Sequence, residues 1–256
     1  MRGKIVCIIQ ARIGSTRFPG KVLYRIGDCS ILSLVVRRVA LSRAVNRSII
    51  VATTDKAEDD VIATLARSEG VGLYRGSERD VLDRYYQAAM HWQADVVIRV
   101  TSDCPLIDYE VIDRVTTRFL EVTHADYASN RIIPSYPKGL DTEIFTVEAL
   151  QQAWQESRLA HDREHVTPYL YRSGRFKLLN IPYEADISYL NLSVDYEKDY
   201  RFLLELYGRL SGERDRFTLS DILSVLRAQP ELLKISQKDG VYEKFLSYSK
   251  ETGPTA

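Results

Sequence analysis

The 256-residue chain has few cysteines and no long hydrophobic run. No apolar stretch approaches the roughly 18–20 residues that a membrane-spanning helix needs, and the run after the charged N-terminus is too short for a signal peptide. We therefore expect a cytoplasmic protein with no membrane partner. Cys7, Cys29 and Cys104 are odd in number and far apart, so neither a disulfide framework nor a metal-ligand pattern is indicated.

An excess of charge of one sign is also lacking. The 35 Lys and Arg residues equal the 35 Asp and Glu residues, so no global basic field is available to gather nucleic acid. An anion-binding site must therefore be local. The sequence has no Gly/Ser/Pro-rich linker and no internal repeat, which favours one domain over residues 1–250. The polar tail, 251–256, is expected to fray.

What is present is an alternation of β-branched runs and amphipathic helical patterns. The patterns predict strands at 4–10, 47–54, 71–74 and 94–101, and helices at 30–43, 56–70, 80–92 and 109–120. Thr54 or Asp55 is expected to cap the second helix, and Gly70 to end it. Such alternation is typical of an α/β fold, in which a parallel sheet carries helices on both faces.

Beyond about residue 125 this alternation loosens. Strand-like runs at 125–130, 142–147, 176–182 and 190–195, with helices between them, indicate a smaller mixed or antiparallel insertion. In parallel sheets, ligands bind beyond the carboxyl ends of the strands. That rule places three segments on one rim: the loop after the first strand, "TTD" at 53–55 and "TSDCPLID" at 101–108.

The loop after the first strand, within "KIVCIIQARIGSTRFPGKVL", is crowded with glycines, hydroxyls and cations. Gly14 and Gly20 let the backbone approach an anion closely, while Arg12, Arg17 and Lys21 supply charge that grips phosphate. The glycine spacing fits neither the dinucleotide fingerprint nor the P-loop. A solvated basic turn remains the alternative on composition alone.

The segment "IIQARIGSTRFPGKVL" closely resembles the opening motif of the CMP-sugar synthetases, the cytidylyltransferases that activate 3-deoxy-2-keto sugar acids. It is most similar to the spore coat polysaccharide biosynthesis protein F branch. Other segments resemble the family in family order: "VATTDKAEDDVI", "RGSERDVLDRYYQAA", "VIRVTSDCPLID", "KGLDTEIFTVEAL", "EHVTPYLY" and "LSVDYEKDY". The resemblance implies a GT-A-like nucleotidyltransferase fold with a mixed, mostly parallel sheet. It also implies CTP as donor, Mg²⁺ as cofactor, a sugar acid as acceptor, and a homodimer with a sugar-binding and dimerisation region at about 125–190.

The same resemblance assigns candidate site residues. The nucleotide is expected to contact Ala11, Arg12, Gly14, Ser15, Lys21, Ala52, Thr53, Arg75 and Ser77. Of these, Arg12, Ser15 and Lys21 would lie at the triphosphate, and the last four near the cytosine and ribose. The candidate catalytic residues are Arg12, Lys21 and Asp103. The acceptor is expected to contact Lys138, Asp141, Glu143 and His165.

Two aspartates follow predicted apolar strands. Asp103 and Asp195 sit where a carboxylate is poorly suited to burial without a partner. Each alone reads as a helix N-cap, but as a pair they can hold a hard divalent cation that also binds phosphate oxygens, and both match the metal ligands of the family. Asp141 and Glu143 fit equally well in a solvated turn entering an edge strand. Asp108 is predicted to cap the helix at 109–120.

Other functions stay open at this point. "HDREH", with His161, Glu164 and His165, fits an inverted zinc-peptidase pattern, although no third ligand is evident. A GT-A glycosyltransferase would carry a D-x-D motif, which is not found near a strand end. A nucleotide-binding module without turnover and a nucleotidyltransferase using GTP or UTP are further alternatives. "RVTSDCPLID" departs from the Gly-Asp-Glu-Pro segment of the 3-deoxy-manno-octulosonate branch, so the acceptor is left open.

Overall fold

A seven-stranded sheet runs through the protein in the order β5-β4-β1-β6-β8-β7-β9. The computed structural model describes residues 3–210 and 215–252. The strands of the large sheet are β1 (Ile5–Gln10), β4 (Ile49–Thr54), β5 (Gly72–Gly76), β6 (Val96–Thr101), β7 (Tyr127–Ser129), β8 (Glu143–Thr146) and β9 (Leu178–Asn180). β1 is parallel to β4 and β6, and β4 to β5, whereas β8 is antiparallel to β6 and β7. The predicted mixed, mostly parallel sheet is confirmed, and β2 (Arg25–Ile26) and β3 (Cys29–Ser30) form a separate hairpin.

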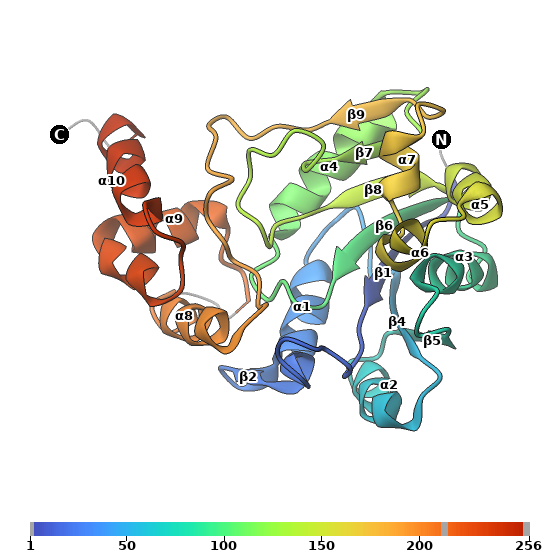
Figure 1. Ribbon diagram of the computed structural model, residues 1–256, viewed down its shortest axis with the longest axis horizontal. Helices are drawn as coiled ribbons and strands as arrows, with labels where there is room; N and C mark the ends of the chain where they lie inside the picture. The colour runs from blue at the N-terminus through green and yellow to red at the C-terminus, as the bar shows by residue number, and fades with distance from the viewer. Residues whose placement is uncertain (1–2, 211–214, 253–256) are drawn as a thin grey trace.

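Helices cover both faces of this sheet because its central strands are apolar on both sides. Along β1, Cys7 and Ile9 pack into one buried cluster, while Val6 and Ile8 pack into the other. The first cluster includes side chains of α1 (Ile31–Val39), α2 (Asp60–Ser68) and α4 (Tyr109–Glu121). The second includes α3 (Val81–His91), α5 (Val147–Glu156) and α7 (Pro168–Arg172). Figure 1 shows these two layers, with α6 (Ala160–His165) beside α3.

The C-terminal helices form a group at one end of the molecule (Figure 1). They are α8 (Glu197–Tyr207), α9 (Leu219–Ala228), the 3₁₀ segment η3 (Pro230–Ile235) and α10 (Val241–Thr252). The first two residues of the predicted frayed tail therefore end a helix, and the rest lie outside the described residues. No helix within 3–210 or 215–252 is long and apolar enough to cross a membrane.

Two local predictions are wrong. Residues 190–195 form no strand but only an isolated bridge between Asn191 and Lys138. Side chains take two of the backbone N–H groups that a strand would use: the Asn191 side chain accepts from Ser193, and the Asp199 carboxylate from Asp195. Neither Thr54 nor Asp55 caps the next helix. A 3₁₀ turn, η2 (Ala57–Asp59), intervenes before α2.

Two other helix-end predictions are confirmed. Gly70 follows the end of α2 with φ of 70°, a left-handed conformation that favours glycine. The Asp108 carboxylate accepts the backbone N–H of Glu110 at 2.8 Å at the start of α4. A second N–H, from Leu219, donates to the other oxygen of Asp108 at 2.6 Å, so this cap also ties the C-terminal helices to the sheet.

Arg38 of α1 makes the second tie to the C-terminal region. Its fully buried guanidinium donates to three backbone carbonyls, those of Ile107, Asp215 and Phe217, at 2.7, 2.7 and 2.9 Å. It also stacks 3.6 Å from the centre of the Phe217 ring. Arginine suits this place because its planar fork reaches several acceptors at once.

We expect Arg38→Met to lower the free energy of unfolding by about 3 kcal/mol, because three buried carbonyls lose their donors. The neighbouring Arg37 is exposed and pairs with Glu69, so Arg37→Met should cost less than about 1 kcal/mol. Urea denaturation of both variants measures the difference. Equal losses in the two variants would contradict the anchoring role of Arg38.

Candidate active site

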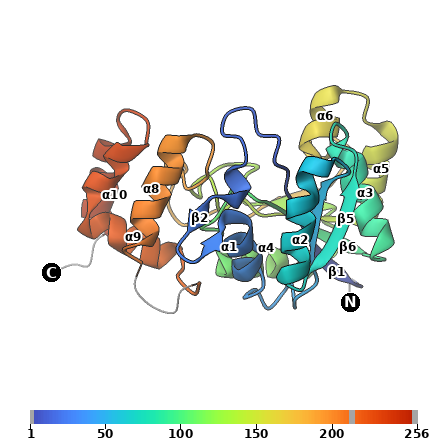
Figure 2. The same cartoon turned by 90° about the horizontal axis from the view of Figure 1, so that it is seen from below.

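The cation-rich loop after β1 is folded by its own backbone and by one buried carboxylate. The Ile13 carbonyl accepts from Ser15 and Gly20, at 2.7 and 3.1 Å, which closes the loop. Gly20 has φ of 68°, a conformation that few other residues adopt. Asp59, fully buried, accepts the Ile13 N–H at 2.7 Å and the Thr54 N–H at 3.3 Å. The loop is therefore fixed to the end of β4, and in Figure 2 it rises between α8 and α6.

Beside this loop, cations and carboxylates from three distant segments meet. The Lys21 ammonium lies 2.8 Å from Asp103 Oδ2, 3.7 Å from Asp195 Oδ1 and 2.5 Å from the Val194 carbonyl. Arg17 donates to Asp195 at 2.6 Å, and Lys138 pairs with the other oxygen of Asp195. Burial alone would raise the pKa of Asp103, but the Lys21 ammonium lowers it and prevails. Asp103 is thus held as a carboxylate.

Close backbone packing brings these segments together. Gly139, with φ of 101°, lies so near the 190–195 segment that a Cβ there would come within 2.5 Å of the Leu192 carbonyl carbon. Lys138 exchanges backbone hydrogen bonds with Leu190 and Leu192, at 3.0 and 2.7 Å. The Val194 N–H donates to the Asp103 carbonyl at 2.8 Å. The glycine therefore allows Lys138 to pair with Asp195 in the segment that lies against Asp103.

A cavity of about 560 Å³ opens over this cluster, and we name it the loop cavity. Its lining includes Ala11, Arg12, Ser15, Arg17, Lys21, Arg84, Asp103, Lys138 and Asp195. Six lysine and arginine side chains line it, and the volume lies within the usual range for small-molecule sites. A polyanion suits such a lining, because its six cations outnumber its four carboxylates, Asp103, Asp141, Glu164 and Asp195.

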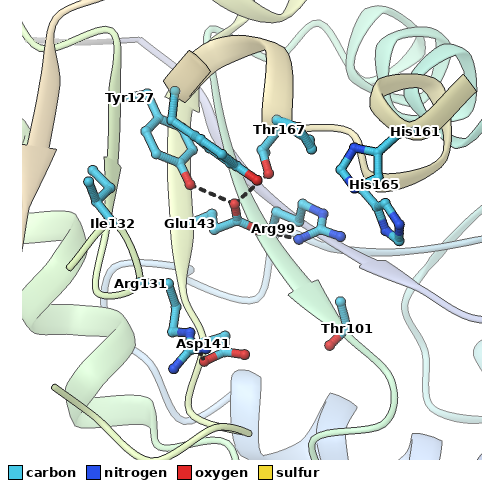
Figure 3. Close-up of a pocket in the computed structure, with 12 residues that line it drawn as sticks. Arg99, Thr101, Tyr127, Arg131, Ile132, Asp141, Glu143, His161, His165 and Thr167 are labelled. Atoms are coloured by element: carbon cyan, nitrogen blue, oxygen red, sulfur yellow. Dashed lines mark hydrogen bonds and ion pairs between the residues drawn. The ribbon is translucent and has the colours of Figure 1, made fainter. Parts of the chain in front are cut away.

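A second cavity, of about 710 Å³, lies beside the first and is named here the β8 cavity (Figure 3). Its floor is an ion pair between Arg99 of β6 and Glu143 of β8, whose other oxygen accepts from Tyr127 and Thr167, both at 2.6 Å. The Arg99 and Glu143 side chains are only 13% and 10% exposed. The Glu143 carboxylate is therefore fully engaged, whereas the Arg99 Nε has no hydrogen-bond partner among the described residues.

Two titratable side chains belong to both cavities. Burial raises the pKa of Asp141 to about 6, although the nearby Arg131 guanidinium opposes this. Burial, together with His161, lowers the pKa of His165. Near neutral pH, Asp141 is thus a carboxylate and His165 a neutral imidazole, and each is able to accept a proton.

The residues predicted to lie near the cytosine and ribose are outside the lining of the loop cavity. Ala52 and Thr53 are buried in β4, and Arg75 of β5 is held by the Thr54 and Lys56 carbonyls and by Asp60. The backbone carbonyl of Ser77 accepts a hydrogen bond from the Arg84 guanidinium at 2.7 Å. None of these lines the loop cavity, nor does Gly14, whereas Ala11, Arg12, Ser15 and Lys21 do. Lys138, Asp141 and His165 line it as well, and Glu143 lines the β8 cavity.

The zinc-peptidase pattern finds no completed site. His161 and His165 lie one helical turn apart on α6, with ring centres 4.5 Å apart, while Glu164 points toward Arg12 at 3.9 Å. Among residues 3–210 and 215–252, no group of three His, Cys, Asp or Glu side chains is arranged to hold a metal. The pair Asp103 and Asp195 does fit Mg²⁺, which takes one or two carboxylates and completes its shell with water and substrate phosphates.

Comparison with known proteins identifies the chemistry of this site. The profile of a family described as cytidylyltransferase matches residues 6–212. The chain belongs to the cytidylyltransferase family. It is therefore an enzyme, a CTP-dependent nucleotidyltransferase, and the predicted family membership is confirmed.

Relatives of this cytidylyltransferase match over nearly their whole length. The uncharacterized protein MJ1063 of Methanocaldococcus jannaschii is 42% identical over 236 residues, 91% of this chain and 94% of that protein. The spore coat polysaccharide biosynthesis protein SpsF of Bacillus subtilis is 32% identical over 240 residues, 89% and 95% of the two chains. A solved cytidylyltransferase of Leptospira borgpetersenii superposes with a TM-score of 0.87 at 32% identity, covering 92% and 98%. The predicted nucleotidyltransferase fold is confirmed.

Several residues of this cytidylyltransferase site were not among the sequence candidates. Arg99 lies inside an apolar strand, where a charged residue facing inward is itself a signal of a buried partner or ligand. Asp59 stands among other acidic residues of a helix start, and nothing in the sequence separates it from them. Tyr127 and Thr167 act through Glu143 and carry no local signal.

We expect Glu143→Gln in this cytidylyltransferase to lower the free energy of unfolding by about 3 kcal/mol, because Arg99 would keep a buried charge without its partner. The matched control is Glu197→Gln, which breaks an exposed pair with Arg201 and should cost about 0.5 kcal/mol or less. Denaturant titration compares the two. A loss at Glu143 no larger than that at Glu197 would refute the account of this pair.

Proposed function

We propose that this cytidylyltransferase transfers CMP from CTP to a sugar acid of the 3-deoxy-2-keto type, releasing pyrophosphate, and so supplies a precursor of surface polysaccharide. The observation that carries the proposal is the junction of two cavities: a cation-lined one beside the loop after β1, and a larger one with a buried Arg99–Glu143 floor. Its likeness to the Bacillus subtilis spore coat protein supports the polysaccharide role.

The loop cavity suits the triphosphate of CTP. Lys21, Arg12 and Arg17 line it and supply ammonium and guanidinium donors, and Ser15 adds a hydroxyl. Lys21 is the central cation of the cluster, and as pyrophosphate departs it is the residue placed to stabilise the charge that develops there. Ala52, Thr53, Arg75 and Ser77 remain proposed neighbours of the cytosine and ribose. Thr53 Oγ1 is buried without a hydrogen-bond partner among the described residues.

The β8 cavity suits the acceptor. Its lining offers hydroxyls and carboxylates for sugar hydroxyl groups, and the guanidinium groups of Arg99 and Arg131 for a carboxylate. Lys138 and His165 complete the proposed acceptor contacts at the boundary with the loop cavity. Because the two cavities share lining residues, an acceptor hydroxyl is held next to the α-phosphate, and positioning of this kind contributes much of the rate in phosphoryl-type transfers.

Asp103 and Asp195 are the proposed ligands of Mg²⁺. When bound, the ion would neutralise charge on the α-phosphate and acidify the attacking hydroxyl. The protein's own part is to hold Asp103 as a carboxylate and to keep Asp195 beside it, through Lys21. Arg17 and Lys138 pair with Asp195 in this structure, and both would be able to bind phosphate oxygens if a divalent cation replaced them there.

We further propose that the enzyme is a cytoplasmic homodimer, with residues 1–250 as one catalytic domain and about 125–190 contributing acceptor and subunit contacts. The use of CTP supports the location, and the family resemblance supports the dimer. Light scattering measures the assembly, and a mass of one chain in solution would refute it.

Nucleotide selectivity is the first expectation. With Mg²⁺, CTP at about a hundred times its dissociation constant should stabilise the protein by about 2.7 kcal/mol, which is roughly 5–10 °C in Tm for a chain of this size. ATP, GTP and UTP at the same concentration should shift Tm much less, and EDTA should weaken the CTP shift. Thermal unfolding records each curve. Equal shifts with all four nucleotides, or none with CTP, would overturn the nucleotide assignment.

Asp103→Asn should lower kcat by about 10³-fold or more, because a lost metal ligand removes several kcal/mol of transition-state stabilisation. Its Tm without nucleotide should stay within a few degrees of the wild type. The control is Asp186→Asn, an exposed carboxylate bonded only locally to Ser188. Pyrophosphate release measures both, and substantial activity in Asp103→Asn would remove this residue from the catalytic site.

A further inference from the structure

Four side chains line both the loop cavity and the β8 cavity: Arg99, Thr101, Asp141 and His165. If CTP and the acceptor occupy the two cavities, as the proposed function has it, the reacting hydroxyl lies at their boundary. Arginine stays protonated and a threonine hydroxyl is a poor base, so only Asp141 and His165 are able to take a proton there. Figure 3 shows them on opposite sides of the cavity.

Asp141 lies on the phosphate side of this boundary. It belongs to the same short loop as Lys138, whose ammonium pairs with Asp195, and the charges of both Lys138 and Asp103 act on its carboxyl group. His165 stands instead on α6, against the ring of His161. Position therefore favours Asp141 as the group nearer to the α-phosphorus.

The Asp141 carboxylate pairs with Arg131 but keeps an oxygen that accepts no hydrogen bond from the described residues. Arg131 Nε lies 3.1 Å from that oxygen, Oδ1. Glu143, two residues later, is by contrast saturated by Arg99, Tyr127 and Thr167. A partly buried carboxylate that lines a cavity and keeps a free lone pair is suited to accept a proton from a ligand hydroxyl.

We propose that Asp141 is the general base of the transfer, an inference that rests on the proposed function. The acceptor hydroxyl passes its proton to the Asp141 carboxylate as its oxygen forms the new bond to the α-phosphorus. The bond from the α-phosphorus to the bridging oxygen breaks, and pyrophosphate leaves with that electron pair. Asp141 then returns the proton to solvent.

The ionisation of Asp141 agrees with this role. Burial raises its pKa to about 6; Glu143 on β8 and Asp103 after β6 act in the same direction, while Arg131 and Lys138 oppose them. A base must be deprotonated to work, so kcat should rise with pH through about 6 and level off above it.

The test is the pH dependence of kcat, followed by pyrophosphate release at saturating CTP and sugar acid. Asp141→Asn should lower kcat by about 10²–10³-fold and abolish the fall of kcat on the acid side of the pH profile, which is called here the acidic limb. The Tm shift with CTP should be kept. His165→Gln should keep that limb, whatever its kcat. Arg131→Gln, which removes the opposing cation, should move the limb up by about one pH unit.

The failures of the two proposals differ. A wild-type enzyme that releases no pyrophosphate with any sugar acid refutes the proposed function, and this inference with it. Wild-type turnover combined with an Asp141→Asn variant that keeps the limb and loses less than about threefold in kcat overturns the inference alone. So does loss of the limb in His165→Gln, or a limb that does not move in Arg131→Gln, a variant that remains informative if Asp141→Asn does not fold.

Discussion

The pairing of the Lys21 ammonium with Asp103 and Asp195 is the interaction on which the candidate active site depends. A buried ammonium is tolerated only with partners, and these two carboxylates come from segments far away along the chain. The contact thus pins the loop after β1 to the end of β6 and to the segment before α8. It also keeps together two carboxylates that would repel each other if left alone, which is what the proposed magnesium site requires.

The Arg99–Glu143 ion pair holds together the floor of the neighbouring β8 cavity. Its role is structural, because neither charge is left unpaired. Each partner cancels the other, and Tyr127 and Thr167 complete the shell of Glu143. What remains available to an acceptor is therefore the outer edge of Arg99, the pair Arg131 and Asp141, and the two histidines. Under the proposed function, selectivity among sugar acids would follow from how these groups match the hydroxyls and carboxylate of the acceptor.

The sequence predicted the alternating half of the fold well because strands buried on both faces, such as β1 and β6, are continuous apolar runs. It also proposed Lys21, Asp103 and Asp195 as site residues, and the structure brings these three side chains together. It failed at 190–195, where side chains of Asn191 and Asp199 take two of the backbone N–H groups that a strand would use. Asp59 and Tyr127 could not be found, since their roles arise from contacts between segments that no local pattern records.

The most direct measurement is ³¹P NMR of the enzyme incubated with CTP, Mg²⁺ and a set of eight- and nine-carbon 2-keto sugar acids. The account predicts that, with at least one acid, CTP is converted into equal amounts of pyrophosphate and a CMP phosphodiester, and that CTP is stable when the acid is omitted. Phosphate and CDP as the products, or consumption of CTP without an acceptor, would contradict it.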